Sequence, residues 1–272
     1  MIRICYQSTT ALSDMGSYAQ RLRQHAADVL LPDTSVHIQG IDPALYGDLV
    51  PGDIYPYPYL KLMIQNAALE ACVKAADDGF DAFVIGSFSE PHLRQSRSAV
   101  DIPVISMPET ALLTACSLAE RFALVTLSPK YARRLTEVVA RHGMGPRLAG
   151  IYTLGEGLDE RGASVALDDP RPLIQALEKV AAEAIAAGAD LLLPSEGILN
   201  EVLYASRVRQ VQGAAVMDCV GLALMQAEMF VRARGSIGLS YGRAWSYPLA
   251  PPSLQARMRR NAGLPDLSGT MR

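Results

Sequence analysis

Two short segments of this chain end in polar residues that suit acid–base chemistry. Residues 79–87 read Gly-Phe-Asp-Ala-Phe-Val-Ile-Gly-Ser, and residues 188–196 read Gly-Ala-Asp-Leu-Leu-Leu-Pro-Ser-Glu. They align without a gap, so Ser87 corresponds to Glu196. A buried carboxylate is an effective general base, and a hydroxyl group can donate a hydrogen bond to a developing negative charge. The pair therefore predicts a site that moves protons.

The elements around these two residues explain how they would meet. Each segment is a Gly-x-Asp turn followed by a short apolar strand, which ends at polar residues. Ligands bind at the carboxyl ends of strands in open parallel sheets, so Ser87 and Glu196 are expected to face one cleft. Strand and helix patterns alternate along the whole chain, which predicts an α/β fold with parallel sheets. The shared register favours two similar halves over the general self-similarity of α/β proteins.

Proline and apolar patterns predict where the other elements lie. Four prolines in residues 41–59 predict a long loop, which is either a lid carrying Tyr55, Tyr57 and Tyr59 or a packed surface loop. Glu90-Pro91 and Ser128-Pro129 each suit the start of a helix. Strands are expected at 3–7, 35–39, 81–85, 102–106, 122–126, 147–153, 191–194 and 214–217. Helices are expected at 17–31, 60–78, 109–120, 170–187, 198–211, 220–232 and 253–261.

Composition narrows the class of protein and its partners. The 272 residues are 50% hydrophobic, yet no apolar run is long enough to span a membrane. The net charge of −3 argues against nucleic acid or an anionic membrane as a partner. No signal-peptide pattern opens the sequence, and four scattered cysteines without metal-ligand spacing indicate reduced thiols. We expect a cytoplasmic homo-oligomer with a small-molecule substrate and no metal site.

Residues 86–93 carry a resemblance to a known family. They read Gly-Ser-Phe-Ser-Glu-Pro-His-Leu, which resembles the Gly-Cys-Phe-x-Asp-Pro-Gly-Leu signature of the hydantoin racemases. These enzymes belong to the aspartate/glutamate racemase superfamily. Residues 6–10 are similar to the family's Asn-Pro-Asn-Thr turn, and residues 187–193 are similar to the strand before its second Gly-Cys. Residues 242–252 are similar to its C-terminal ending, so the resemblance covers residues 1–252.

The resemblance implies two α/β lobes related by a pseudo-twofold axis, with the active site between them. We assign residues 1–112 and 215–252 to the first lobe, residues 113–214 to the second, and residues 253–272 to a C-terminal tail. The family works without a metal or an organic cofactor, and its two cysteines flank the carbon that loses and regains a proton. Here Ser87 and Glu196 occupy the two cysteine positions, with Ser195 as the alternative if the second strand shifts by one.

The candidate site residues follow strands or begin helices. We expect Glu196 to be the general base and Ser87 to be a hydrogen-bond donor, or a nucleophile if Glu196 or His92 lies within reach. Glu196 also suits a simple role at the start of a helix, where its charge would interact with the helix dipole. The candidate substrate-binding residues are Gln7, Ser8 and Thr9, then Phe88, Ser89 and His92, then Thr126 and Ser128, and finally Ser195 and Gly197.

Three functions follow from these residues. The first is a cofactor-independent enzyme of the superfamily that moves a proton next to a carbonyl of a small carboxylate or cyclic ureide, with isomerisation, racemisation or decarboxylation as the outcome. The second is a hydrolase in which Glu196 activates water, or Ser87, against a C–N or C–S bond. The third is a binding protein without activity, which Glu196 disfavours, because loss of the cysteines would more readily leave a small inert residue than a carboxylate.

Overall fold

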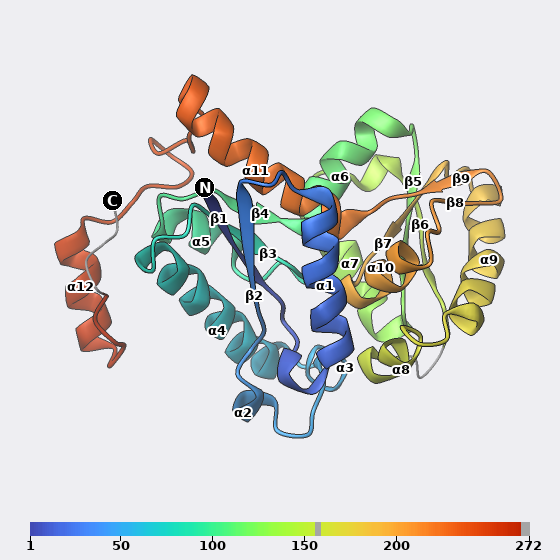
Figure 1. Ribbon diagram of the computed structural model, residues 1–272, viewed down its shortest axis with the longest axis horizontal. Coiled ribbons are helices and arrows are strands. Elements are labelled where there is room, and N and C mark those ends of the chain that lie inside the picture. Colours follow the sequence, from blue (N-terminus) through green and yellow to red (C-terminus); the bar gives the residue numbers. More distant parts are fainter. Residues whose placement is uncertain (156–158, 268–272) are drawn as a thin grey trace.

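Two separate sheets form the centres of the two lobes (Figure 1). A computed structural model describes residues 1–155 and 159–267. The first sheet is wholly parallel and has the order β2-β1-β3-β4. Its strands are β1 (Ile2–Gln7), β2 (Thr34–Gln39), β3 (Ala82–Ile85) and β4 (Val104–Ser106). The α/β class and the parallel pairing agree with the sequence-based prediction.

The second sheet repeats the order of the first and adds one short edge strand. Its order is β6-β5-β7-β9-β8, and the first four strands are parallel. Only β8 runs antiparallel to its neighbour β9. The strands are β5 (Phe122–Thr126), β6 (Leu148–Thr153), β7 (Leu191–Pro194), β8 (Gln210–Val211) and β9 (Ala214–Val216). Strands β3 and β7, which precede Ser87 and Glu196, therefore hold equivalent places in the two sheets.

The Gly-x-Asp register of the two halves is also a structural equivalence. Gly79 and Gly188 both have positive φ angles, 76° and 90°, which glycine adopts without steric cost. The amide N–H that follows each turn bonds to the neighbouring strand in the same way. Asp81 donates to the carbonyl of Arg3 at 2.8 Å, and Asp190 donates to that of Arg121 at 3.1 Å. The alignment of the two segments is therefore confirmed.

Helices cover both faces of the first sheet, because its strands bury side chains on both sides. The helices α4 (Pro58–Asp77) and α5 (Leu93–Ala99) form one apolar cluster with Cys5 and Phe83. The helices α1 (Gly16–Val29) and α11 (Cys219–Ile237) pack on the other face, in a cluster that includes Ile4 and Val84. Alternate residues along β1 and β3 thus point to opposite cores, as the pleat requires.

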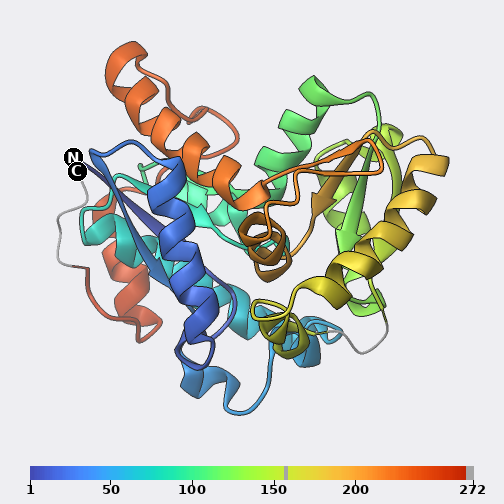
Figure 2. The ribbon, with the colours of Figure 1, turned by 45° about the vertical axis from the view of Figure 1, so that its right-hand side comes forward.

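The larger core continues from one lobe into the other. It contains Val84 of the first sheet together with Leu124 and Leu192 of the second. The helix α6 (Met107–Leu118) contacts β4 and β7, and α10 (Gly197–Ala205) contacts α1 and α11. Figure 2 shows α11 crossing above the region where the lobes meet. The helices α7 (Pro129–Arg141) and α9 (Arg171–Ala186) pack on the second sheet.

The prediction of a long loop over residues 41–59 is wrong in part. The segment forms the short helices α2 (Pro43–Tyr46) and α3 (Pro51–Ile54), and α4 begins at Pro58. Each of these three helices has proline as its first residue. Proline suits that position, because the first helical N–H has no partner within the helix. Three of the four prolines therefore mark helix starts rather than the absence of helices.

Other elements also differ from the prediction. The helix expected to begin at Pro91 starts at Leu93, because Glu90 and His92 have positive φ angles of 49° and 48°. The helix expected over 198–211 ends at Ala205, and β8 follows it. The helix α8 (Glu160–Val165) was not predicted.

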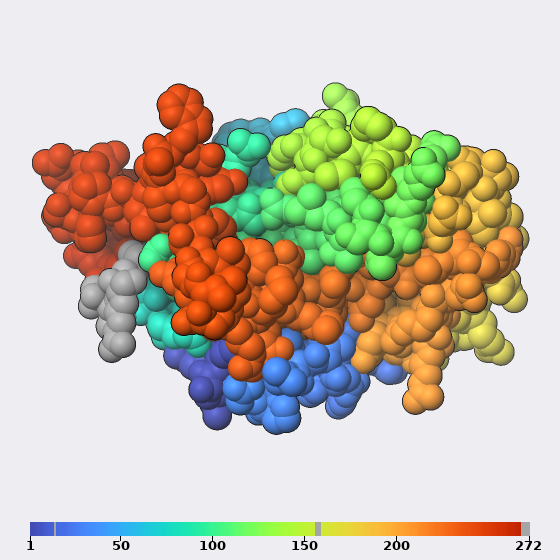
Figure 3. All heavy atoms as spheres, turned by 90° about the horizontal axis from the view of Figure 1, so that it is seen from above, coloured from blue at the N-terminus to red at the C-terminus, as the bar shows by residue number. Residues whose placement is uncertain are grey.

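The C-terminal segment forms one end of the molecule, as the red atoms in Figure 3 show. It contains α12 (Pro252–Asn261), which lies against the first lobe through an ion pair of 2.9 Å between Arg259 and Glu70. Residues 268–272 of the expected tail lie outside the described residues. Among the residues that are described, no helix is long and apolar enough to cross a membrane.

Candidate active site

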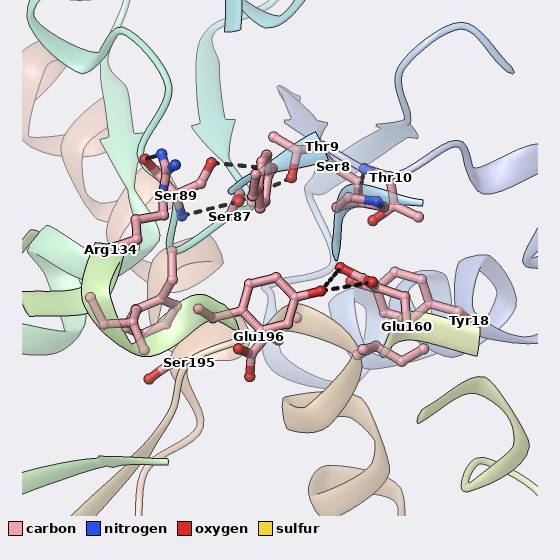
Figure 4. A pocket seen from close by; sticks show the side chains of 18 of the residues that line it. Ser8, Thr9, Thr10, Tyr18, Ser87, Ser89, Arg134, Glu160, Ser195 and Glu196 are labelled. Atoms are coloured by element: carbon pink, nitrogen blue, oxygen red, sulfur yellow. Dashed lines mark hydrogen bonds between the residues drawn. The ribbon is translucent and has the colours of Figure 1, made fainter. Parts of the chain in front are cut away.

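A narrow cavity lies where the carboxyl ends of β1, β3 and β7 meet. It is lined by Ser8 and Thr9 after β1, by residues 86–89 after β3, and by residues 195–198 after β7. Figure 4 shows Ser87 and Ser89 on one side of the cavity and Ser195 and Glu196 on the other. The free space is about 570 Å³, including the part that is open to solvent. The cavity therefore suits a small ligand.

Glu196 is fixed in the cavity by two donors from the end of β5. The hydroxyl group of Thr126 donates to its Oε1, and the backbone N–H of Leu127 donates to its Oε2 at 3.3 Å. Glu196 is the N-cap residue of α10, but its side chain makes no capping hydrogen bond. The carboxylate faces the cavity instead. This arrangement leaves it free to act on a ligand.

The surroundings of Glu196 make its carboxyl group a stronger base than an ordinary glutamate. Burial, with a smaller contribution from the nearby Glu160 carboxyl group, raises its pKa to about 8. The hydrogen bonds from Thr126 and Leu127 act in the opposite direction, because they stabilise the charged form. A general base works best when its pKa lies near the working pH.

The hydroxyl oxygen of Ser87 accepts two hydrogen bonds. The hydroxyl group of Thr9 donates to it at 3.0 Å, and the backbone N–H of Ser89 donates at 3.1 Å. Both of its oxygen lone pairs are thereby used, and its own O–H has no acceptor among the described residues. Neither Glu196 nor His92 is hydrogen-bonded to Ser87. The geometry therefore suits a hydrogen-bond donor and lacks the base that a serine nucleophile needs.

Glycines beside the two key residues allow a tight approach of aromatic rings. A Cβ atom on Gly86 would lie 2.2 Å from the ring of Tyr6, and one on Gly197 would lie 2.3 Å from the hydroxyl oxygen of Tyr18. Both tyrosines are buried. The turns that present Ser87 and Glu196 are thus packed directly against Tyr6 and Tyr18, which fixes the position of both strand ends.

The structure adds a second carboxyl group that the sequence did not indicate. Glu160, the first residue of α8, is buried and accepts from the hydroxyl group of Tyr131, which lies 2.9 Å from both carboxylate oxygens. Burial raises the pKa of Glu160 above its usual value. Tyr131 and Glu160 both line the cavity. A buried carboxyl group and a phenol in contact form a unit that can store or pass on a proton.

The candidate residues from the sequence separate into two groups. Those that line the cavity are Ser8, Thr9, Ser87, Phe88, Ser89, Ser195, Glu196 and Gly197. Thr126 lies behind Glu196 and holds it. The remaining three candidates, Gln7, His92 and Ser128, do not line the cavity.

The three candidates outside the cavity have other surroundings. The side chain of Gln7 donates to the Ser8 carbonyl oxygen and accepts from Gln39. His92 bonds to Asn66 at 3.0 Å and lines a separate surface pocket. Ser128 precedes α7, but its hydroxyl group makes no capping bond, contrary to the expectation from Ser128-Pro129. Of the tyrosines considered for a lid, Tyr55 lines the cavity, whereas Tyr57 and Tyr59 are exposed.

Several cavity residues were missed by the sequence analysis. Tyr131 and Arg134 lie three residues apart on α7, which starts at the carboxyl end of β5. That spacing places both on one face of a helix, and it was a usable signal. Glu160 had no comparable signal, because its place depends on the path of the chain after β6. Tyr18 lines the cavity from α1, and the sequence carries no comparable signal for it either.

The four cysteines take no part in the cavity. All are free thiols, and none lines it. Burial raises the pKa of Cys5 to about 12, and it also raises the pKa values of Cys72 and Cys219. Thiolates at these positions are therefore strongly disfavoured. The acid–base groups of the cavity are carboxyl and hydroxyl groups.

Comparison with known proteins shows which family and which solved structures this chain is similar to. The family model described as "Asp/Glu/Hydantoin racemase" matches residues 16–226. A hydantoin racemase of Pseudomonas sp. (strain NS671) is 30% identical over 187 residues, which are 66% of this chain and 70% of that protein. The fold also matches that of two allantoin racemases.

The first of these structures, from Pseudomonas fluorescens, has a TM-score of 0.72 and 21% identity, and the match covers 92% of this chain and 98% of that one. The second, from Klebsiella pneumoniae, has a TM-score of 0.68 and 19% identity, and the match covers 92% and 95%. These likenesses confirm the two-lobed fold.

Proposed function

Because the chain belongs to the Asp/Glu/hydantoin racemase family, a family of isomerase-class enzymes, we propose that it moves a proton at a carbon next to a carbonyl group. Its substrate is a small cyclic ureide or carboxylate. Glu196 is the general base, and Ser87 stabilises the charge that develops on the carbonyl oxygen. The proposal differs from the two-thiol chemistry implied by the family resemblance, because no cysteine lines the cavity.

The observation that carries this proposal is the placement of Glu196. Its carboxyl group lies at the end of β7, faces the cavity, is held by Thr126 and Leu127, and has a pKa of about 8. A base of this strength can take a proton from a carbon that a neighbouring carbonyl group has acidified. The C–H bond breaks, its electron pair moves into the enolate, and Glu196 holds the proton.

Ser87 supports the same step from the other sheet. Its hydroxyl oxygen accepts from Thr9 and Ser89, so its O–H can donate to the enolate oxygen. A hydrogen bond that is already oriented before the reaction costs no reorganisation when the charge appears. Removing one such donor from an enzyme site commonly lowers the rate by about 100- to 1000-fold.

The Tyr131–Glu160 pair is the proposed source of the returning proton. Tyr131 bonds to Glu160, and burial raises the pKa of that carboxyl group above its usual value. A proton that returns to the face of the carbon opposite Glu196 would invert the configuration. A proton that returns from Glu196 would restore it.

The hydrolase alternative has less support. Its serine version needs a base next to Ser87, and neither Glu196 nor His92 is bonded to that hydroxyl group. The relatives described above are named racemases, and none of those names describes hydrolysis.

Proton NMR in D₂O tests the proposal. The protein is incubated with a panel of hydantoins, amino acids and malonates, and signals of protons next to carbonyl groups are followed. We expect loss of one such signal, with Glu196→Gln abolishing the exchange and Ser87→Ala slowing it by about 100-fold. Glu120→Gln, which changes an exposed carboxylate, serves as the matched control. Unchanged exchange in both Glu196→Gln and Ser87→Ala would show that these residues are not the site.

The assembly and the location of the protein remain predictions. Exposed apolar side chains on and before α4, including Leu49, Tyr59 and Leu62, are consistent with the expected homo-oligomer. The expected cytoplasmic location is consistent with the four free thiols. Light scattering coupled to size-exclusion chromatography would measure the oligomeric state, and a monomer would contradict the first prediction.

A further inference from the structure

Arg134 brings a positive charge to the cavity without a carboxylate partner among the described residues. It lies on α7 and lines the cavity together with Ser87 and Ser89. Neither carboxyl group of the cavity forms an ion pair with Arg134: Glu160 accepts from Tyr131, and Glu196 accepts from Thr126. A buried charge is normally paired, because its transfer from water is costly. The charge of Arg134 therefore needs explanation.

The contacts of Arg134 use only part of its hydrogen-bonding capacity. Its Nη2 donates to the carbonyl oxygen of Ser89 at 2.6 Å, and its guanidinium group lies 5.0 Å from the centre of the Tyr55 ring. Its Nε and Nη1 atoms are buried and have no hydrogen-bond partner within residues 1–155 and 159–267. Most buried donors in native proteins are satisfied. An anion that entered the cavity would satisfy these donors.

We propose that Arg134 binds a carboxylate group of the substrate, which thus carries a carboxylate in addition to the carbonyl next to its acidic C–H bond. This inference rests on the proposed function, because it names the substrate class of the same site. A guanidinium group offers paired N–H donors that match the two oxygens of a carboxylate. The narrow cavity favours a planar carboxylate over a bulkier phosphate.

A purely structural role for Arg134 explains only part of its hydrogen-bonding groups. Arg134 links α7 of the second lobe to the Ser87–Ser89 turn of the first through Nη2 alone. That link leaves Nε and Nη1 unsatisfied, which is costly for buried donors. A carboxylate beside the Ser89 turn would stand next to Ser87, the proposed donor to the enolate. The two groups would then hold two parts of one small substrate.

Binding of two probes that differ in one charge tests the inference. Hydantoin-5-acetate and its methyl ester share the ring and the acidic C–H, but only the first has a carboxylate. We expect wild-type protein to bind the acid at least about 10-fold more tightly than the ester in isothermal titration calorimetry. Arg134→Met should weaken binding of the acid by roughly 10- to 100-fold and change that of the ester little.

Neighbouring variants give the controls. Arg133 lies next to Arg134 on α7, but its side chain is 94% exposed, so Arg133→Met should leave both affinities unchanged. Arg134→Lys keeps the charge but loses the planar donor pair, and it should recover part of the affinity for the acid. Equal binding of acid and ester by the wild type, an equal loss of both in Arg134→Met, or no binding of the acid at millimolar concentration would overturn the inference.

The same experiment separates this inference from the proposed function. Glu196→Gln should abolish proton exchange but keep the preference for the acid over the ester. If the wild type shows the preference and Arg134→Met loses it while no proton exchange occurs, the proposed function fails and the anion site stands. If exchange depends on Glu196 while the charge preference is absent, the anion site alone fails.

Discussion

At the scale of single residues, the site depends on how the pKa of Glu196 is set. Burial and the Glu160 carboxyl group raise it, and the bonds from Thr126 and Leu127 lower it. The balance at about 8 leaves a large fraction of the group deprotonated in weakly alkaline solution while keeping it a strong base. The hydroxyl group of Thr126 is a contributor that a conservative substitution can remove.

Replacing Thr126 by valine should therefore shift the pH dependence of catalysis. The variant loses a donor that stabilises the charged form of Glu196, so the pKa of Glu196 should rise further. Because the base must be deprotonated to act, the rate should reach its plateau at a higher pH than in the wild type. Thr136→Val, on the exposed side of α7, is the control. A pH–rate profile measures the shift, and an unchanged profile would show that Thr126 does not tune the base.

At the scale of elements, the start of α10 fixes Glu196 through close packing. Gly197 lets the helix approach Tyr18, whose hydroxyl oxygen would lie 2.3 Å from an added Cβ atom. The next atoms, the ring carbon of Tyr18 that bears this hydroxyl group and the hydroxyl oxygen of Tyr6, would lie at an ordinary 3.6 Å. The clash thus involves one atom that can be removed.

Gly197→Ala should displace the start of α10 and lower both activity and the free energy of unfolding, by about 1–3 kcal/mol for the latter. Adding Tyr18→Phe removes the clashing oxygen, so the double variant should recover much of the loss. Gly16→Ala, where nothing lies within 4 Å of the added atom, is the control. Chemical denaturation of the wild type, Gly197→Ala, Tyr18→Phe and the double variant completes a double-mutant cycle. If Tyr18→Phe gave no recovery, the close approach would not be the reason for glycine at position 197.

The same elements show what the sequence could predict. Strands β5 and β7 have the predicted boundaries, because each is a short apolar run between strong turn signals. The equivalence of Ser87 and Glu196 followed from the Gly-x-Asp register alone. By contrast, no motif marks Glu160, and the helix spacing of Tyr131 and Arg134 does not by itself place Arg134 in the cavity. Their roles depend on how the two lobes pack, which is a property of the tertiary structure.

At the scale of the whole molecule, a buried ion network ties the lobes together. His25 on α1 bonds to Glu201 of α10 at 2.7 Å and to Asp218, the N-cap residue of α11, at 2.8 Å. Burial lowers the pKa of His25, but the hydrogen bonds that it donates to Asp218 and Glu201 outweigh it, and the net result is a rise to about 9. The imidazolium form therefore holds three helices in place.

The stability of the fold should follow the charge of His25. The pKa of His25 is about 9 in the folded state and about 6.5 in the unfolded state, so this contribution is fully present below pH 6.5 and is lost as pH rises through 9. His25→Asn should lower the free energy of unfolding at pH 6 by up to about 3 kcal/mol, and by less above pH 9. Denaturation at both pH values tests this, with exposed His37→Asn as the control. An equal loss of unfolding free energy at pH 6 and above pH 9 would contradict a charged His25.

The most direct test of the central claim is the pH dependence of proton exchange with a substrate found in the NMR panel. The account predicts that the wild-type rate rises with pH to a plateau, with a midpoint near 8 that reports the ionisation of Glu196. It also predicts that Glu196→Gln abolishes the exchange, so that no midpoint near 8 is observed. Exchange in Glu196→Gln at the wild-type rate, with the same midpoint, would contradict the claim that Glu196 is the base.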